Sequence, residues 1–511
     1  MAAGAFVVLG FVAHLLYLTI NCPIDLSGDE AHYWDWSRQL DLSYYSKGPV
    51  VAYIIRASCA IFGDVMWAVR LPALLFAAAI SAVTYLLTLR IFHSDRLALG
   101  ATLLLAAVPM FIAGSVLMTI DPPMMMMWAL ATLLAVIAIV EHRPKLWPAV
   151  GLAIGLGALA KYGILLWFVG LTLFMLIDRA SRVHLRSLAF WSMPLIALLC
   201  LLPPIIWNAR HDWVSLKHVG TQTIAGETKV LVNPMHTLEM IGGQVGVVGP
   251  VLFVFMMLAC IDAWKLARQK PADRQARAML LLLAIGVGFF CTVLLGSLRT
   301  KIQPNWPAPA YFSLLILTAW WIGRQWSDPV AWRRTRGWFW AGVVGFACIA
   351  TPVLHRMQIL YPIIPAEPRR YDPTYRLLGW SELGTRLGRE LQAGDAFILC
   401  QDYQVAAQAA FYTPGQPKTF YVSSYYHDPA WRRRLSQYDI WPDRRLDQPS
   451  LLGRDAIFIG YENPELHAAF DRFETLPEEQ IVRGGVRVRT FRLHRGIGFK
   501  GMSRPAEGDR H

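Results

Sequence analysis

Long stretches without charged residues alternate with short polar segments over roughly the first two thirds of the chain. Two of the clearest uncharged stretches are 72–89 and 278–297. A helix needs about 20 apolar residues to cross roughly 30 Å of hydrocarbon. The pattern therefore predicts a bundle of membrane-spanning helices.

Hydropathy and turn signals together predict about eleven spans in this region. Their expected limits are near 3–21, 68–90, 97–118, 123–140, 147–160, 162–178, 187–207, 241–264, 278–297, 307–323 and 338–355. Only Lys161 separates the fifth span from the sixth. The first run has no basic segment before it and no A-x-A-like site between its end and Cys22, which favours a retained helix over a cleaved signal peptide.

From about residue 356 the pattern becomes typical of a soluble domain. Short apolar and aromatic runs at 396–400, 419–423, 456–460 and 486–493 predict strands among helical and turn segments. The expected fold is an all-α polytopic membrane bundle followed by a small α/β domain outside the membrane. We expect these domain limits: 1–355 for the membrane domain, including a polar loop at 22–67, then 356–498 for the α/β domain and 499–511 for a disordered tail.

Composition supports the bilayer as the solvent, since 55% of the residues are hydrophobic, 16% are charged and the mean hydropathy is +0.39. The formal net charge of +13 lies mostly in short loops and in the C-terminal segment. This distribution predicts a topology signal and a basic tail near the membrane, and no nucleic-acid partner. The seven cysteines are scattered, so they indicate neither a disulfide framework nor a zinc site.

Arginines and lysines follow the second, fourth, sixth, eighth and tenth predicted spans, and so fall on one side of the bundle. Such loops face the cytoplasm in a plasma membrane. We therefore expect a bacterial inner-membrane protein with a cytoplasmic N-terminus and a periplasmic C-terminal domain. The periplasmic face would then carry 22–67, the turn at Asp121, 208–240 and 298–306.

The first of these outer segments opens with an acidic pair, Asp29 and Glu30, and continues to Tyr45 and Lys47. A carboxylate can act as a general base and a lysine can bind a phosphate, which transfer from a phosphate-linked donor requires. Tyr45 is a candidate substrate contact. A structural alternative stays open, in which Ser27 and Asp29 cap an interfacial helix.

Two further charged residues lie at the ends of predicted spans. Asp121, at the start of one span, is a third candidate catalytic acid, with a simple helix cap as the alternative. Lys161 is a candidate phosphate ligand, with snorkelling to lipid phosphate as the alternative. The neighbouring Tyr162 is a candidate substrate contact.

The loop 298–306 carries an unusual set of polar residues for the outer face. Arg299 and Lys301 are cations on the side opposite to the topology signal, and an anionic phosphate headgroup is the most economical reason for them. The same loop supplies three candidate substrate contacts, Gln303, Asn305 and Trp306.

A metal site is a weaker expectation. Asp121, His211 and His218 could hold a divalent ion, although the spacing of the two histidines matches no tight ligand signature. We expect no required cofactor and leave a divalent metal open.

Several motifs, taken as a set, carry a family resemblance. They are Gly28-Asp29-Glu30-Ala31-His32-Tyr33-Trp34, Tyr45-Ser46-Lys47-Gly48-Pro49, Asp121-Pro122-Pro123, Lys161-Tyr162-Gly163 and the run from Lys301 to Tyr311. This set resembles the ArnT-like branch of the dolichyl-phosphate-mannose protein mannosyltransferase superfamily, glycosyltransferase families 39 and 83. The likeness spans roughly residues 20 to 320.

The resemblance implies a GT-C fold and an inverting transfer of a sugar from undecaprenyl or dolichyl phosphate. It also implies that Asp29 is the catalytic base and that Lys47 lies beside the donor phosphate. Relatives that transfer aminoarabinose have an acid just before this lysine, where the present chain has Ser46. The sugar and any metal arrangement therefore stay open.

We expect a monomeric glycosyltransferase that moves a sugar from a polyprenyl-phosphate donor to a lipid A-like glycolipid or to a protein hydroxyl, among membrane lipids. One alternative is a flippase or transporter of lipid-linked sugar, which would place charged residues near the bilayer midplane. Another is an O-antigen ligase-type enzyme, which uses a diphosphate-linked glycan. The lipid product released by the protein distinguishes the three.

Overall fold

The computed structural model of the chain describes residues 2–20, 22–220, 233–325, 333–363, 372–392 and 394–505. Contacts divide the chain into two compact units. We call the first the helical unit, which comprises Met1–Ile20, Lys47–Val51 and Arg70–Leu354. We call the second the mixed unit, which comprises Asn21–Ser46, Ala52–Val69 and His355–His511.

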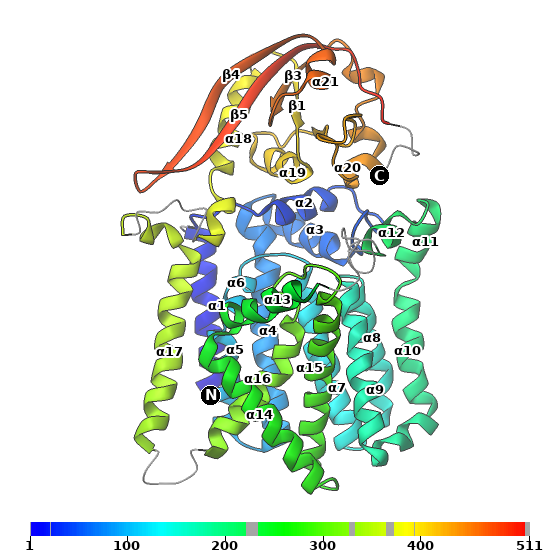
Figure 1. Cartoon of the computed structure of the whole chain (residues 1–511), viewed down its shortest axis with the longest axis vertical. Coiled ribbons are helices and arrows are strands. Elements are labelled where there is room, and N and C mark those ends of the chain that lie inside the picture. Colours follow the sequence, from blue (N-terminus) through cyan, green and yellow to red (C-terminus); the bar gives the residue numbers. More distant parts are fainter. Residues whose placement is uncertain are drawn as a thin grey trace. The chain divides into compact units, whose positions relative to one another are not determined.

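Helices make up the regular structure of the helical unit (Figure 1). In chain order they are α1 (Ala2–Ile20), α4 (Met66–Phe92), α5 (Asp95–Ala107), α6 (Pro109–Gly114), α7 (Asp121–Val140), η1 (Pro144–Leu146), α8 (Trp147–Ala158), η2 (Tyr162–Leu166), α9 (Trp167–Ile177), η3 (Arg179–Arg186), α10 (Leu188–Cys200), α11 (Leu202–Arg210), α12 (Val214–Gly220), α13 (Pro234–Val248), α14 (Pro250–Gln269), α15 (Arg274–Ser297), α16 (Ala308–Gln325) and α17 (Arg333–His355). The labels η1 to η3 mark 3-10 helices, and the first turn of α4 belongs to the mixed unit.

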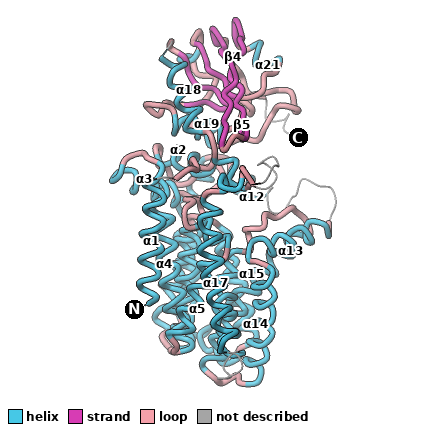
Figure 2. The backbone as a smooth tube through the Cα atoms, turned by 90° about the vertical axis from the view of Figure 1, so that its left-hand side faces the viewer, coloured by secondary structure: helices cyan, strands magenta, loops and turns pink. Residues whose placement is uncertain are grey.

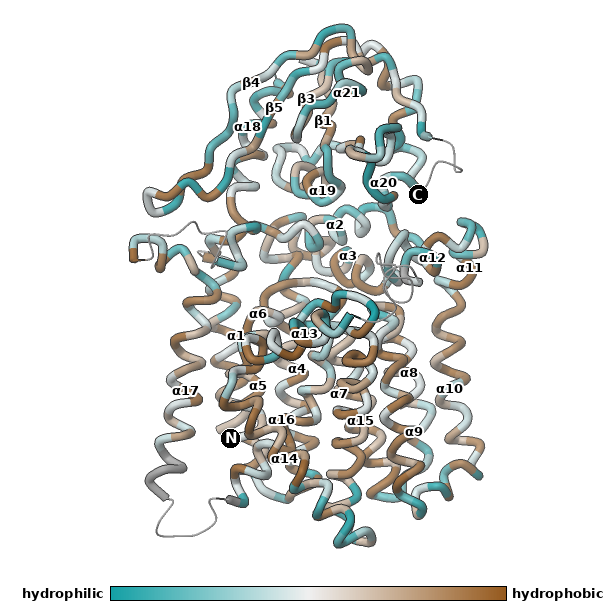
Figure 3. Tube along the Cα trace, in the orientation of Figure 1, coloured by the Kyte–Doolittle hydropathy of each residue, from teal (hydrophilic) through white to brown (hydrophobic). Residues whose placement is uncertain are grey.

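The described residues contain seven helices that are long and apolar enough to cross a membrane, or eight if Tyr162–Ile177 and Arg179–Arg186 form one span bent by 117°. Figure 3 shows apolar residues along most of these helices. Each of the eleven expected spans overlaps a helix. However, α5, α8 and α16 do not meet the length and apolarity of a full span, so fewer described helices meet this test than the eleven spans expected.

Breaks in the helices explain two of these shorter elements. Helix α5 ends at Ala107 and Pro109 opens α6, because proline has no amide hydrogen to donate to the preceding turn. Helix α8 ends at Ala158, and the extended residue Lys161 (φ −149°) precedes η2. The break that Lys161 predicted in the sequence is present in the structure.

Close helix contacts in the bundle depend on small residues. A Cβ added at Gly170 of α9 would overlap the Cα of Ile285 in α15, and Gly288 of α15 lies against Gly170. Such residues let helix backbones approach closely in a membrane, where van der Waals packing holds helices together. The buried Trp167 donates its indole N–H to the Thr132 hydroxyl at 3.1 Å, which satisfies a polar group that lipid could not.

Ion pairs join the basic loops at one end of the helical unit. Glu141, which follows α7, contacts Arg90 at 2.8 Å and Arg274 at 3.6 Å. Asp178, which follows α9, contacts Arg277 at 3.1 Å. These contacts bring together basic residues that the sequence had assigned to one side of the bundle.

The strands of the described chain all belong to the mixed unit (Figure 2). Its elements in chain order are α2 (Gly28–Ser37), α3 (Val50–Phe62), η5 (Met357–Leu360), η7 (Pro373–Leu377), α18 (Trp380–Gln392), β1 (Ala396–Cys400), α19 (Tyr403–Tyr412), β2 (Thr419–Tyr421), α20 (Gln437–Ile440), η8 (Pro442–Arg444), η9 (Pro449–Leu451), β3 (Asp455–Ile459), α21 (Pro464–Ala468), β4 (Phe470–Arg483) and β5 (Val486–Phe499). The first two residues of α3 belong to the helical unit.

The five strands form one sheet in the order β2-β1-β3-β5-β4. Strand β1 is parallel to β2 and β3, whereas β5 is antiparallel to β3 and β4. Ile398 and Cys400 of β1 lie in one apolar core with α18 and α19, and Phe397 and Leu399 lie in a second core. A strand buried on both faces has a continuous apolar sequence, which is why 396–400 was predicted correctly.

Strand β4 was not predicted. It forms a long hairpin with β5, and Gly484 (φ 56°) and Gly485 (φ 79°) make the turn. Its sequence is rich in charged residues and includes Pro477, which falls at a register shift between Leu476 and Glu479. An edge strand tolerates a proline at a bulge, but a charged sequence that contains proline does not predict a strand.

The mixed unit includes most of the loop 22–67, which we had expected to belong to the membrane domain. Contacts far apart in sequence explain the difference. The Asp25 carboxylate accepts the Trp380 amide at 2.8 Å, and the Tyr438 hydroxyl donates to Asp35 at 2.7 Å. The loop therefore folds with the C-terminal residues.

The expected disordered tail, 499–511, is ordered over its first part. The Lys500 amide donates to the Ala469 carbonyl at 2.8 Å, and the Arg504 guanidinium donates to the Tyr425 hydroxyl at 3.1 Å. Arg504 also pairs with the buried Asp439 at 3.1 Å. Contacts with the rest of the mixed unit thus extend to Arg504, and 506–511 lie outside the described residues.

Candidate active site

A capping box starts α2 in the mixed unit. The Ser27 hydroxyl accepts the Glu30 amide at 3.2 Å, and the Glu30 carboxylate accepts the Ser27 amide at 2.9 Å. Glu30 is fully buried. Its carboxylate fixes the start of the helix, which gives this predicted catalytic residue a capping role.

Asp29 differs from its neighbour because its side chain is exposed. It lies in the first turn of α2, where backbone amides and the helix dipole favour a negative charge. Its Oδ1 accepts the side-chain amide of Gln404 at 2.8 Å. The structure therefore presents an accessible carboxylate at a fixed helix start, which suits a general base.

His32 lies one turn further along α2, inside the mixed unit. Its Nε2 accepts the Trp36 indole N–H at 3.1 Å, and the rings of Tyr403 and Tyr438 pack beside it. Burial lowers the pKa of His32 to about 3, and the positive charge of Arg434 acts in the same direction. The imidazole is neutral near pH 7 and helps to pack α2 in place.

Tyr45, a predicted substrate contact, is half-buried in the mixed unit. Its backbone amide donates to the Gln437 side chain at 2.7 Å. The adjacent Tyr44 is buried and stacks on Trp36 with ring centroids 4.3 Å apart. These contacts fix the backbone that leads to Lys47.

In the helical unit, an ion pair joins two residues that the sequence had singled out separately. The Lys161 ammonium lies 2.6 Å from Oδ1 of Asp121. Asp121 opens α7, and Lys161 lies in the break between α8 and η2. The pair gives the Asp121 carboxylate a charged partner in the helical unit.

The Lys47 segment packs against the same break. A Cβ at Gly48 would overlap the carbonyl oxygen of Leu159, and the Val50 amide donates to that oxygen at 3.3 Å. Leu159 stands two residues before Lys161 in the chain. The motif around Lys47 and the motif around Lys161 therefore meet through their backbones, and glycine at 48 permits the close approach.

The loop 298–306 docks on α13. The Asn233 amide donates to the Leu298 carbonyl at 2.7 Å, and the Lys301 ammonium pairs with Glu239 of α13 at 2.9 Å. Arg299 is exposed, and no ion pair links it to another described residue. Sequence reasoning missed Glu239, because a lone exposed glutamate carries no local signal.

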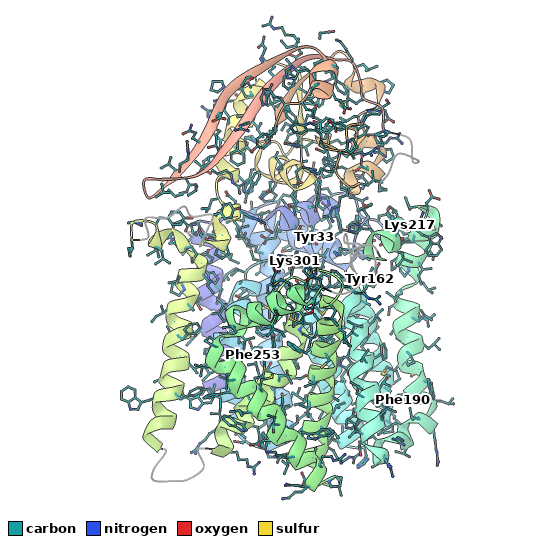
Figure 4. All side chains as sticks on the ribbon, in the orientation of Figure 1. Tyr33, Tyr162, Phe190, Lys217, Phe253 and Lys301 are labelled. Atoms are coloured by element: carbon teal, nitrogen blue, oxygen red, sulfur yellow. The ribbon has the colours of Figure 1, made fainter. Side chains whose placement is uncertain are left out.

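The three candidate substrate contacts of this loop differ in exposure: Gln303 and Asn305 are exposed and Trp306 is half-buried. Trp306 packs against the core of the bundle. Figure 4 shows Tyr162 and Lys301 at the same end of the helical unit, with Phe190 near the opposite end. The candidates on the helical unit thus gather at one end.

A cavity of about 350 Å³ lies in the helical unit. Apolar residues of α1, α4, α5, α6 and α7 provide most of its lining, and Asp121 and Asn305 are among its polar lining residues. A hydrocarbon chain could occupy such a space, with a polar group beside the carboxylate and the amide.

The metal candidates Asp121, His211 and His218 do not assemble. The described residues contain no group of three histidine, cysteine or acidic side chains placed to hold a metal ion. His211 stacks on Trp207 with ring centroids 4.0 Å apart, and its Nδ1 bonds the Trp207 carbonyl at 2.8 Å. The structure gives His211 a packing role.

Comparisons with known proteins agree with this arrangement. Residues 46–207 match the family model described as dolichyl-phosphate-mannose-protein mannosyltransferase. The lipid A galacturonosyltransferase RgtD of Rhizobium johnstonii is 29% identical over 83% of this chain and 88% of its own. An undecaprenyl phosphate-α-4-amino-4-deoxy-L-arabinose arabinosyl transferase of Pseudomonas fluorescens is 26% identical over 74% of this chain and 69% of its own.

Solved structures show the same fold. The crystal structure of ArnT from Cupriavidus metallidurans bound to undecaprenyl phosphate has a TM-score of 0.60 and 17% identity. The match covers 96% of this chain and 98% of that one. The apo form of the same protein gives a TM-score of 0.59.

The fold and the relatives together define a multi-pass inner-membrane glycosyltransferase of the GT-C fold. Within that class the chain is ArnT-like, and its residues 46–207 match the dolichyl-phosphate-mannose-protein mannosyltransferase model. The predicted likeness to ArnT-like glycosyltransferases is confirmed.

Proposed function

We propose that the chain transfers one sugar from a polyprenyl-phosphate donor, such as undecaprenyl phosphate, to a lipid A-type glycolipid, with inversion at the anomeric carbon. The observation that carries the proposal is the exposed carboxylate of Asp29, fixed at the start of α2. Two relatives support the substrates, since the name of one specifies lipid A and that of the other an undecaprenyl phosphate-linked sugar.

In the proposed reaction, Asp29 takes the proton of the acceptor hydroxyl as its oxygen attacks the anomeric carbon. The bond between this carbon and the phosphate oxygen breaks on the opposite face, and polyprenyl phosphate leaves. Phosphate is already a good leaving group, so it needs cations more than a general acid. Lys47, Arg299 and Lys301 are proposed to supply this charge, with no required cofactor.

The cavity of the helical unit supports a lipid substrate. Its mostly apolar lining suits a hydrocarbon chain, and the Asn305 amide can donate to the polar group that the chain carries. Lys161 is proposed to hold Asp121 so that its carboxylate does not repel the phosphate.

A reconstitution experiment tests the proposed function. Purified protein would be given undecaprenyl phosphate linked to galacturonose or to 4-amino-4-deoxyarabinose, together with lipid A. Release of undecaprenyl phosphate and a one-sugar mass increase of lipid A are expected. Release of the diphosphate would support an O-antigen ligase, relocation of the lipid without turnover would support a flippase, and sugar on protein only would change the acceptor.

Replacing Lys47, Arg299 or Lys301 singly with Ala is expected to weaken donor binding. A charge-assisted contact to phosphate contributes about 1.5–3 kcal/mol, so the apparent KM for the donor should rise about tenfold or more. Steady-state kinetics at varied donor concentration measures this. Lys145→Ala, an exposed lysine in η1, is the matched control, and an unchanged donor KM in all three variants would exclude this cluster as the phosphate site.

We propose that the ion-paired basic loops of the helical unit face the cytoplasm and that the mixed unit is periplasmic. The excess of arginine and lysine in these loops supports this orientation. A reporter that is active only in the periplasm, fused to the C-terminus, should be active. Activity of a cytoplasm-only reporter at that position would overturn the orientation.

A further inference from the structure

Helix α19 carries three polar side chains at intervals of four residues, Gln404, Gln408 and Tyr412. This spacing places them on one face of the helix. All three bond to the segment from Leu26 to Asp29, although about 380 residues separate the partners in sequence (Asp29 and Gln404 differ by 375). One face of a C-terminal helix therefore holds the segment that contains the proposed base.

Two of these contacts fix the backbone just before α2. The Leu26 amide donates to the Tyr412 hydroxyl at 2.6 Å, and the Gln408 side-chain amide donates to the Leu26 carbonyl at 2.8 Å. Both backbone groups of Leu26 are thus satisfied by α19. The entry of the chain into α2 is set by a helix of the C-terminal part.

The third contact reaches the carboxylate itself. The Gln404 Nε2 donates to Oδ1 of Asp29 at 2.8 Å. A Cβ added at Gly28 would lie 2.6 Å from the Cβ of Gln404, so glycine at 28 leaves the room that the Gln404 side chain occupies. The Asp402 carboxylate accepts the backbone amide of Gln404 at 2.7 Å and caps α19, which fixes the backbone at Gln404.

We propose that Gln404 is a positioning residue for Asp29, holding one carboxylate oxygen so that the other faces the acceptor hydroxyl. The proposal rests on the proposed function, in which Asp29 is the base. An exposed aspartate samples several rotamers, and only some of them present an oxygen to the acceptor. The amide of Gln404 selects one rotamer and, as a donor, stabilises the ionised carboxylate that a base must have.

The side-chain amide of Gln404 also determines the hydrogen-bonding role of the Asp29 carboxylate. A glutamine Nε2 can only donate, so the Asp29 oxygen that faces it must accept. A glutamate at 404 would have the same shape but would present a second negative charge to Asp29. The Gln404→Glu change therefore reverses the interaction with little change in volume.

The test is steady-state kinetics of Gln404→Glu and Gln404→Lys with the donor and acceptor used above. For Gln404→Glu we expect kcat to fall on the order of tenfold or more, the donor KM to stay unchanged and the acid limb of the pH–rate profile to move to higher pH. Gln404→Lys keeps a donor toward Asp29 and should retain more activity than Gln404→Glu. Gln448→Glu is the matched control. Among the described residues, the Gln448 side chain donates only to the Arg445 backbone carbonyl and accepts only the hydroxyl of the exposed Ser450.

A double-mutant cycle separates this proposal from the proposed function. If Gln404 acts through Asp29, adding Gln404→Glu to Asp29→Asn should lower the residual rate no further. Full activity of Asp29→Asn would overturn Asp29 as the base. A disabled Asp29→Asn enzyme together with wild-type kinetics in folded Gln404→Glu would overturn the positioning role alone, and so would additive effects of the two changes.

Discussion

Asp29→Asn is expected to lower kcat by about 10²–10⁴-fold, the usual contribution of a positioned general base. A hydroxyl is a poor nucleophile near neutral pH, so the transfer depends on a group that removes its proton. Asparagine preserves the shape of the side chain, and its oxygen can still accept the Gln404 amide. The change therefore removes the base while leaving the start of α2 intact.

A single-turnover measurement, with saturating donor and with enzyme in excess over the acceptor, reports the chemical step directly. Asp41→Asn is a suitable control, because Asp41 lies in the same loop and its Oδ1 accepts the Leu42 amide at 2.7 Å, a bond that asparagine can also make. A folded Asp29→Asn protein that works at more than about a tenth of the wild-type rate would place the base elsewhere.

Arg444→Met is expected to destabilise the mixed unit by about 3–5 kcal/mol. Arg444 and Asp35 are 1% and 0% exposed, and Nη2 of the arginine lies 3.0 Å from Oδ1 of the aspartate. The Tyr438 hydroxyl donates to the other oxygen of Asp35, and Arg444 also donates to the Thr419 carbonyl at 2.9 Å. Removing the arginine takes the closer of two cations from a buried carboxylate and leaves only Arg38, at 3.5 Å from the same oxygen, which is strongly unfavourable.

Thermal unfolding of the purified protein should show this loss as a fall in Tm of roughly 6–20 °C. The neighbouring Arg445 is the matched control, because it forms an exposed pair with Asp447. Arg445→Met should change stability by less than about 1 kcal/mol. Equal shifts for the two variants would show that the buried pair contributes no more than an exposed one.

The sequence predicted those helices and strands whose own residues determine their structure. Apolar runs marked the helices, and the buried strand 396–400 was visible because both of its faces are apolar. The charged edge strand β4 was missed because Pro477 and its many polar residues are tolerated only at an edge. Fewer described helices than the eleven expected spans meet the length and apolarity of a full span, because breaks shorten α5 and α8.

In the candidate site, too, residues in short motifs were predicted and residues placed by distant contacts were missed. Asp29 and Lys47 were recognisable because each lies in a short motif, and the pairing of Asp121 with Lys161 joined two motifs already noted. Gln404 and Glu239 were missed because nothing in their neighbouring residues distinguishes them from other polar residues. Their roles depend on contacts that only the folded chain creates.

The ion pair between Asp35 and Arg444 also affects when the mixed unit can fold during synthesis. The two residues are 409 positions apart, and ribosomes add roughly 5–20 residues per second. Arg444 is therefore synthesised roughly 20–80 s after Asp35. Helix α2 cannot make its native contacts with α19 and Arg444 before then. The nascent chain therefore completes the contacts around its proposed base only when synthesis is nearly finished. A chain that ends before residue 404 cannot hold Asp29 through Gln404.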